Sequence, residues 1–114
     1  MNETTWDVAI VGGGTAGFTA GIYSCRAGLS TVLLEQTTPG GQIANVDCIE
    51  NFPGFPEGIS GPDLGPKLVD QAMQSGLDVR LGQANGVESS ESYWIIGTCD
   101  EPVVARSVII ATGS

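Results

Sequence analysis

The chain has 114 residues, which is the size of one domain. Apolar residues make up 41% and charged residues only 15%, against a usual charged share of about 25%, which excludes a disordered polar chain. Acidic residues outnumber basic ones by 13 to 4, for a net charge of −9, and no Lys/Arg cluster exists, so neither a nucleic-acid surface nor an anionic-membrane patch is expected.

The first third of the chain has the pattern of a strand, a helix and a second strand. Asp7–Val11 is short, β-branched and apolar, which is typical of a strand buried on both faces. Apolar side chains recur at helical spacing over Thr15–Ala27, with Gly28 as a helix stop, and Thr31–Glu35 is a second buried-strand pattern. A βαβ unit of this length predicts two parallel strands.

The middle of the chain predicts a loop followed by a helix. Gln36–Gly61 is rich in Pro and Gly and predicts a long ordered loop, a kind that is more often functional than idle. Pro62–Ser75 predicts a helix that begins with Pro62 and stops at Gly76. Pro66 removes one backbone hydrogen bond, so the first turn is expected to be irregular. The helix residues expected to face the core are Leu64, Leu68, Ala72 and Met73.

The last part of the chain predicts short strands. Leu77–Leu81 is typical of a third parallel strand. Segments 87–89, 93–98 and 103–107, separated by turn residues, predict a small antiparallel meander, and Ser107–Ala111 predicts a last buried strand. The expected fold is therefore α/β, a parallel sheet with a small antiparallel meander.

A glycine motif lies between the first strand and the first helix. Gly12–Gly17 fits G-x-G-x-x-G, and Glu35 ends the next strand, so the motif has the context that a dinucleotide fingerprint requires. Gly12 lets the chain turn sharply, and Gly17 lets the helix pack against the strand. Gly14 lets a pyrophosphate approach the backbone, where N–H groups at the helix start bind it without Lys or Arg.

The acidic residue at the end of the second strand predicts a preference for a nucleotide without a 2′-phosphate. A carboxylate at Glu35 accepts hydrogen bonds from both ribose hydroxyls of an adenosine and repels a 2′-phosphate, which disfavours NADP. Because NAD and FAD share the adenosine diphosphate half, this site alone does not choose between them. A glycine-rich turn with a surface Glu is the structural alternative.

The composition leaves few candidates for other chemistry. The chain has no His, so an imidazole base and a His-containing zinc site are excluded. Cys25, Cys48 and Cys99 form no C-x-x-C pair, which fits a reducing compartment, and cytoplasmic location is the default. Cys25 is expected to be a packing residue, and no metal ligand and no catalytic acid, base or nucleophile is predicted. The apolar run Val8–Val11 is too short to span a membrane.

Four segments of the chain together match one known family. They are Gly12–Gly17 with Glu35, Gly40–Ile43 (GGQI), Glu50–Pro56 (ENFPGFP) with Gly61–Leu64 (GPDL), and Val108–Gly113 (VIIATG). In these segments the chain resembles the FAD domain of the low-molecular-weight thioredoxin reductases, class II of the pyridine nucleotide-disulphide oxidoreductases. ENFPGFP after GGQ is the most specific of them. The resemblance implies a Rossmann-like FAD-binding domain of the three-layer ββα type.

The resemblance also implies cofactor contacts at matched positions. Those at the FAD diphosphate would be Gly12, Gly14, Thr15 and Ala16, with Gly17 in the same turn. Those on the stretch from diphosphate to flavin would be Gly40, Gly41 and Gln42. Glu35 would hold the adenosine ribose, Asn51 would approach the isoalloxazine ring, and Val87 would flank the adenine through its backbone. The last segment close to the cofactor would be Ala111, Thr112 and Gly113.

Residues 1–114 would form the N-terminal part of an FAD-binding domain, without the family's NADPH domain, its redox C-x-x-C pair and the returning C-terminal FAD segment. In the family, electrons pass from NADPH to FAD, then to a disulfide and a dithiol partner protein, so the chain alone would be an incomplete catalyst. A homodimer or a complementing second chain is expected. The alternatives are an NAD-binding dehydrogenase module and a non-catalytic dimerising remnant.

Overall fold

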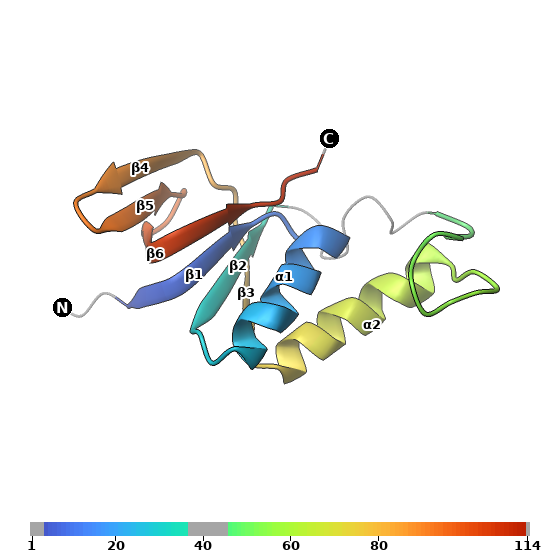
Figure 1. The fold of residues 1–114 in the computed structure, drawn as a ribbon. Helices are drawn as coiled ribbons and strands as arrows, with labels where there is room; N and C mark the ends of the chain where they lie inside the picture. The colour runs from blue at the N-terminus through green and yellow to red at the C-terminus, as the bar shows by residue number, and fades with distance from the viewer. Residues whose placement is uncertain (1–3, 37–45, 114) are drawn as a thin grey trace.

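The computed structural model describes residues 4–36 and 46–113 (Figure 1). Its elements in chain order are β1 (Thr5–Val11), α1 (Thr15–Arg26), β2 (Thr31–Glu35), α2 (Gly61–Gln74), β3 (Asp78–Leu81), β4 (Gly86–Ser90), β5 (Tyr93–Gly97) and β6 (Val103–Ile110). The predicted helices and the first three strands are confirmed to within two residues at each end. Neither helix in the described ranges is long and apolar enough to cross a membrane.

The strands form one six-stranded sheet in the order β3-β2-β1-β6-β5-β4. β1 pairs in parallel with β2 and with β6, and β2 pairs in parallel with β3. β5 is antiparallel to both β4 and β6. The structure therefore confirms the α/β class, the parallel βαβ unit and the antiparallel meander.

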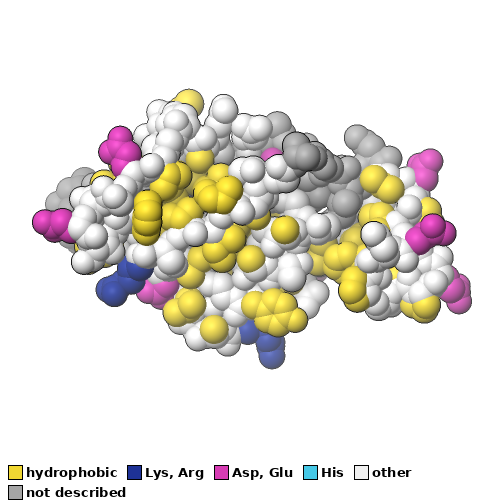
Figure 2. All heavy atoms as spheres, turned by 45° about the horizontal axis from the view of Figure 1, so that its top comes forward, with side chains coloured by type: hydrophobic (Ala, Val, Ile, Leu, Met, Phe, Trp, Pro, Cys, Tyr) yellow, Lys and Arg dark blue, Asp and Glu magenta, His cyan; other side chains and the backbone are white. Residues whose placement is uncertain are grey.

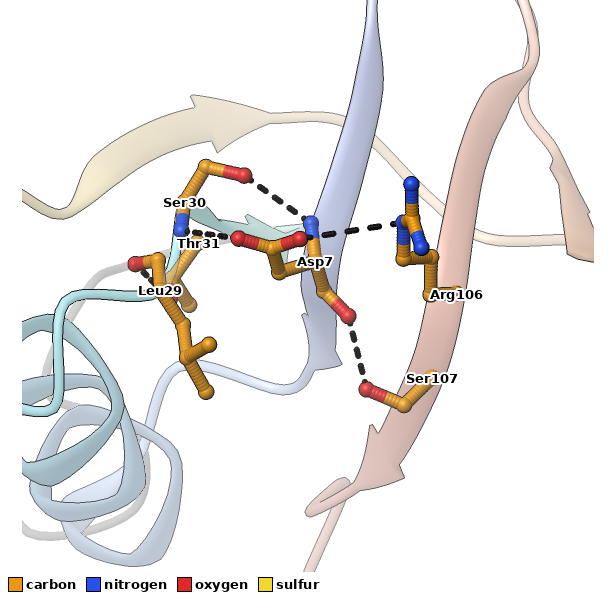
Figure 3. A network of polar contacts seen from close by, with 6 residues as sticks. All are labelled: Asp7, Leu29, Ser30, Thr31, Arg106 and Ser107. Carbon is orange, nitrogen blue, oxygen red and sulfur yellow. Dashed lines mark hydrogen bonds and ion pairs between the residues drawn. The ribbon is translucent and has the colours of Figure 1, made fainter.

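The prediction of two separate strands near the end of the chain is wrong. Segments 103–107 and Ser107–Ala111 form one strand, β6, which pairs with β5 at its start and with β1 along most of its length. The two segments meet at Ser107, whose hydroxyl donates to the Asp7 carbonyl at 2.7 Å (Figure 3). Polar side chains in mid-strand are thus satisfied by the neighbouring strand.

The two faces of β2 are buried in different core clusters. Leu33 belongs to the helix-side cluster, with Phe18 of α1 and Leu64 of α2. Val32 and Leu34 belong to a second cluster that includes Ile96 and Val103 of the meander. Because successive side chains of a strand point to opposite faces, the helices and the meander lie on opposite sides of β2. This arrangement of helices, parallel strands and meander agrees with the expected three-layer ββα type.

Each helix ends just before the glycine that was predicted to stop it. Gly28 has φ +85° and Gly76 has φ +108°, a left-handed conformation that favours glycine after a helix. Pro66 lies inside α2 without ending it. The expected core contact of Met73 is wrong, because its side chain is 54% exposed.

The far end of β6 is also more open than predicted. Ile110 is 63% exposed and Ile109 37%, although both were expected in a buried strand. The reason is that α1 packs on β1, β2 and α2, and the helix-side core cluster of the described residues does not extend over β6. Cys25 packs against that cluster, as expected, and Cys48 and Cys99 are exposed thiols.

Candidate functional site

The glycine loop leaves the carboxyl end of β1 and enters α1, and two of its glycines are required by the fold itself. Gly12 has φ +115°, and a Cβ atom there would collide with the Ala111 carbonyl and lie 2.9 Å from Thr112 Cα. A Cβ atom at Gly17 would collide with the Gly12 carbonyl. The Ala111 amide in turn donates to the Val11 carbonyl at 2.8 Å. The start of α1 and the exit from β6 are therefore packed directly against the turn.

Gly14 differs from those two glycines. It is the N-cap of α1, with φ −89° and ψ −162°, an extended conformation that any residue can adopt. A Cβ atom at Gly14 would have no described neighbour within 4 Å. The N–H groups of the following turn have no partner inside the helix and carry the positive end of its dipole. The fold of the described residues thus gives no reason for glycine here, whereas a ligand approaching these amides would.

Glu35 is held beside the glycine loop. The Gly13 N–H donates to Glu35 Oε1 at 2.5 Å, and the Gly82 N–H donates to the Glu35 carbonyl at 2.9 Å. A hydrogen bond to an ionised carboxylate is shorter and stronger than a neutral one. These bonds hold the carboxylate in a defined position beside the glycine loop, close to the amides of the first turn of α1.

A cavity lies at the carboxyl edge of the parallel strands. It is lined by Val11, Gly12, Leu34, Glu35, Gln36, Gly82, Ala84 and Thr112. These residues come from the ends of β1, β2 and β3 and from the segment after β6. Ligands of open α/β sheets bind outside the carboxyl ends of the strands, at this kind of crevice.

The charge on the surface is unevenly distributed. On the face shown in Figure 2, acidic side chains lie mostly at the two ends of the molecule, with apolar side chains between them. The first turn of α1 contains no acidic residue. Anion binding at this turn would depend on local amide dipoles, which the net charge of −9 does not remove.

The comparisons with known proteins agree with this geometry. A family model described as "Pyridine nucleotide-disulphide oxidoreductase" matches residues 6–114. The chain belongs to this oxidoreductase family. Thioredoxin reductase of Bacillus subtilis (strain 168) is 41% identical over 112 residues, which are 98% of this chain and 35% of that protein. Thioredoxin reductase of Listeria monocytogenes is 39% identical, with the same coverage.

Solved structures give the same result. Thioredoxin reductase of Lactococcus lactis has a TM-score of 0.90 and 41% identity, covering 96% of this chain and 36% of that one. The enzyme of Streptococcus pyogenes has a TM-score of 0.92 and 38% identity, covering 98% and 36%. The resemblance to thioredoxin reductases is confirmed, and the chain spans about a third of the length of these relatives.

The structure brings several predicted positions of this family member together. Gly12, Glu35 and Thr112 line the cavity, and Ala111 contacts Gly12. The predicted residues at the adjoining helix start are Gly14, Thr15, Ala16 and Gly17. Gly113 directly follows Thr112 and has φ +78°. Their role in binding stays a prediction.

Other predicted positions lie elsewhere. Asn51 is exposed on a separate loop, and Val87 is on β4 and does not line the cavity. The three positions outside the described residues are Gly40, Gly41 and Gln42. Sequence reasoning missed Gly82 and Ala84, which do line the cavity. The signal was available, because Gly82 follows the third parallel strand and must reach the same edge as Glu35.

Proposed function

We propose that this chain is the N-terminal, FAD-binding part of a thioredoxin-reductase-like flavoenzyme. The observation that carries the proposal is Gly14, a glycine at the start of α1 in open space, beside a cavity that contains a carboxylate. A dinucleotide diphosphate explains why a side chain is absent there. The family membership and the relatives named thioredoxin reductase support the oxidoreductase class.

The residues present fit the adenosine diphosphate half of FAD. The amides of Thr15 and Ala16 belong to the first turn of α1 and would bind the diphosphate, and Glu35 would bind the ribose hydroxyls. When bound, FAD supplies the electron transfer between a nicotinamide donor and a disulfide, while the protein places and tunes the cofactor. The chain's own contribution would be to hold the cofactor and to disfavour a 2′-phosphate at this site.

The wider activity is part of the same proposal. The family resemblance suggests NADPH as the electron donor, and the relatives named thioredoxin reductase, of which this chain covers about a third, suggest a dithiol protein such as thioredoxin as the partner. The sequence contains no C-x-x-C pair, so a redox disulfide of that kind would have to come from outside residues 1–114. The chain alone would therefore be an incomplete catalyst. A homodimer, a complementing second chain and a cytoplasmic location stay predictions.

Replacing Gly14 tests the proposal directly. ADP, FAD and NAD are titrated by calorimetry into the wild type, Gly14→Ser and Gly86→Ser. Gly86 is the matched control, since a Cβ atom there also meets nothing within 4 Å and the position lies on the edge strand β4. We expect Gly14→Ser to weaken ADP and FAD binding by about tenfold or more, the equivalent of losing one charge-assisted hydrogen bond, and Gly86→Ser to change neither.

The other outcomes separate the alternatives. Wild type that responds to neither ADP nor FAD, or Gly14→Ser that binds both as wild type does, contradicts the proposal. Binding of NAD in preference to FAD favours the dehydrogenase module. Self-association without any nucleotide binding favours the non-catalytic remnant.

A further inference from the structure

Asn85 and Gly86 form the single Asn-Gly pair of the sequence. Both residues are exposed, and Gly86 is the first residue of β4, the outermost strand of the meander (Figure 1). The backbone nitrogen of a glycine is less shielded than that of any other residue with an N–H group, because glycine has no Cβ atom. A Cβ atom built at Gly86 would have no described neighbour within 4 Å, so the surroundings leave this nitrogen accessible as well.

Asn85 lies against the neighbouring strand β5. Its backbone N–H donates to the Gly97 carbonyl at 2.9 Å, and a Cβ atom built at Gly97 would lie 2.8 Å from Asn85 Oδ1. Gly86 is paired with the same residue, Gly97. Two residues of one strand thus face one residue of its partner, which is the arrangement of a β-bulge. A bulge at the end of an edge strand interrupts the ladder, so little pairing has to be broken before the peptide between Asn85 and Gly86 can rotate.

We propose that Asn85 is a site of spontaneous deamidation and that its isoaspartyl product loosens β4. In the first step the Gly86 nitrogen forms a bond to Asn85 Cγ, the Cγ–Nδ2 bond breaks, and Nδ2 leaves as ammonia with the proton of the Gly86 amide. Water, the only co-reactant, then adds across one of the two new imide linkages. Opening at Cγ gives aspartate. Opening at the main-chain carbonyl carbon of Asn85 gives isoaspartate, in which the main chain passes through the former side chain.

The two products differ in their effect on the meander. Aspartate adds a negative charge to a chain of net charge −9 and keeps the backbone length. Isoaspartate adds the same charge and also a further carbon atom in the main chain, directly before Gly86, where the pairing of β4 with Gly97 begins. Because the register of two strands depends on backbone length, the added atom displaces the pairs that follow, such as Val87 with the buried Ile96. The isoaspartyl chain should therefore lose pairing along β4.

Peptide mass spectrometry of the full chain, kept at mildly alkaline pH, tests the chemistry. Asn51 is the control within the chain, since it is also exposed but precedes Phe52. Gly86→Ala is the control variant, because the φ of Gly86 is not left-handed and the surrounding space admits a methyl group. We expect aspartate and isoaspartate at Asn85, neither at Asn51 over the same period, and a rate about tenfold lower in Gly86→Ala, whose methyl group shields the attacking nitrogen.

An unmodified Asn85, or modification at the same rate at Asn51, overturns the proposal. An unchanged rate in Gly86→Ala overturns attack by the Gly86 nitrogen. Where that variant does not fold, isoaspartate in the wild type decides, since direct hydrolysis of the side chain gives aspartate alone.

Amide hydrogen exchange tests the consequence for β4. It compares fresh wild type, aged chain enriched in isoaspartate, and Asn85→Asp, which has the charge without the added carbon atom. We expect exchange over β4 to be about tenfold faster in the isoaspartyl chain and within about twofold of fresh wild type in Asn85→Asp. Unchanged exchange in the isoaspartyl chain, or equal acceleration in Asn85→Asp, overturns the role of the lengthened backbone.

Discussion

The two edges of the parallel sheet differ in whether side chains cap the backbone amides there. At the amino edge, the Asp7 carboxylate accepts from the Ser30 N–H and the Ser30 hydroxyl accepts from the Asp7 N–H, both at 2.9 Å (Figure 3). Arg106 Nε lies 3.8 Å from the same carboxylate. At the carboxyl edge, Gly14 has no side chain with which to cap α1. At the amino edge, side chains thus cap backbone amides, whereas at the carboxyl edge the first turn of α1 has no side-chain cap.

The largest effect should come from the glycines that the fold needs at the carboxyl edge. Gly17→Ala places a methyl group against the Gly12 carbonyl and 3.4 Å from Leu33 Cδ1 in the buried core. Because backbone cannot move aside cheaply here, we expect a loss of about 3 kcal/mol or more in the free energy of unfolding, measured by urea denaturation. A change below about 1 kcal/mol would show that the turn relaxes and that Gly17 is not structurally required.

A smaller effect should come from the closed amino edge. Asp7→Ala removes the acceptor of the Ser30 amide and the partner of Arg106, but leaves the bond from the Asp7 amide to the Ser30 hydroxyl. We expect the unfolding free energy to fall by about 1 kcal/mol, the usual worth of one such hydrogen bond. Nucleotide affinity should not change. If it does, the two edges are coupled and the contrast between them fails.

Arg106→Ala serves as the matched control at the same edge. Its side chain is 67% exposed and the Asp7 side chain 37%, so the ion pair is screened by water. We expect a change of at most about 0.5 kcal/mol in the unfolding free energy. A loss as large as that of Asp7→Ala would assign the effect to the ion pair in place of the Ser30 hydrogen bond.

Local patterns in the sequence were sufficient for the elements that determine the site. Thr31–Glu35 was predicted with its observed bounds, because a short apolar run between turn residues needs no tertiary information. The nearness of Glu35 to the glycine loop followed from the parallel strand order that a βαβ unit imposes. Those predictions depend only on the local sequence pattern and on the connectivity of a βαβ unit.

The errors concern residues whose surroundings come from distant parts of the chain. Ile110 and Met73 have apolar side chains, but their burial depends on which element lies over them. The continuity of β6 through Arg106 depends on β1, a strand nearly a hundred residues earlier, whose Asp7 bonds the neighbouring Ser107. Ala84 reaches the cavity only because of where β3 lies in the sheet. Local periodicity does not contain these contacts.

The smallest effect on stability, with the opposite sign, should come from adding a side-chain cap to the start of α1, as side chains cap the amino edge. Ser is a better N-cap than Gly, because its hydroxyl accepts from an amide of the first turn. Gly14 has an extended conformation and open space, so Gly14→Ser should raise the unfolding free energy by a few tenths of a kcal/mol, measured without ligand. The same hydroxyl would compete with a diphosphate for those amides. Ligand-free protein that is less stable than wild type would mean that glycine is needed here by the fold, and the contrast between the edges would no longer point to a ligand.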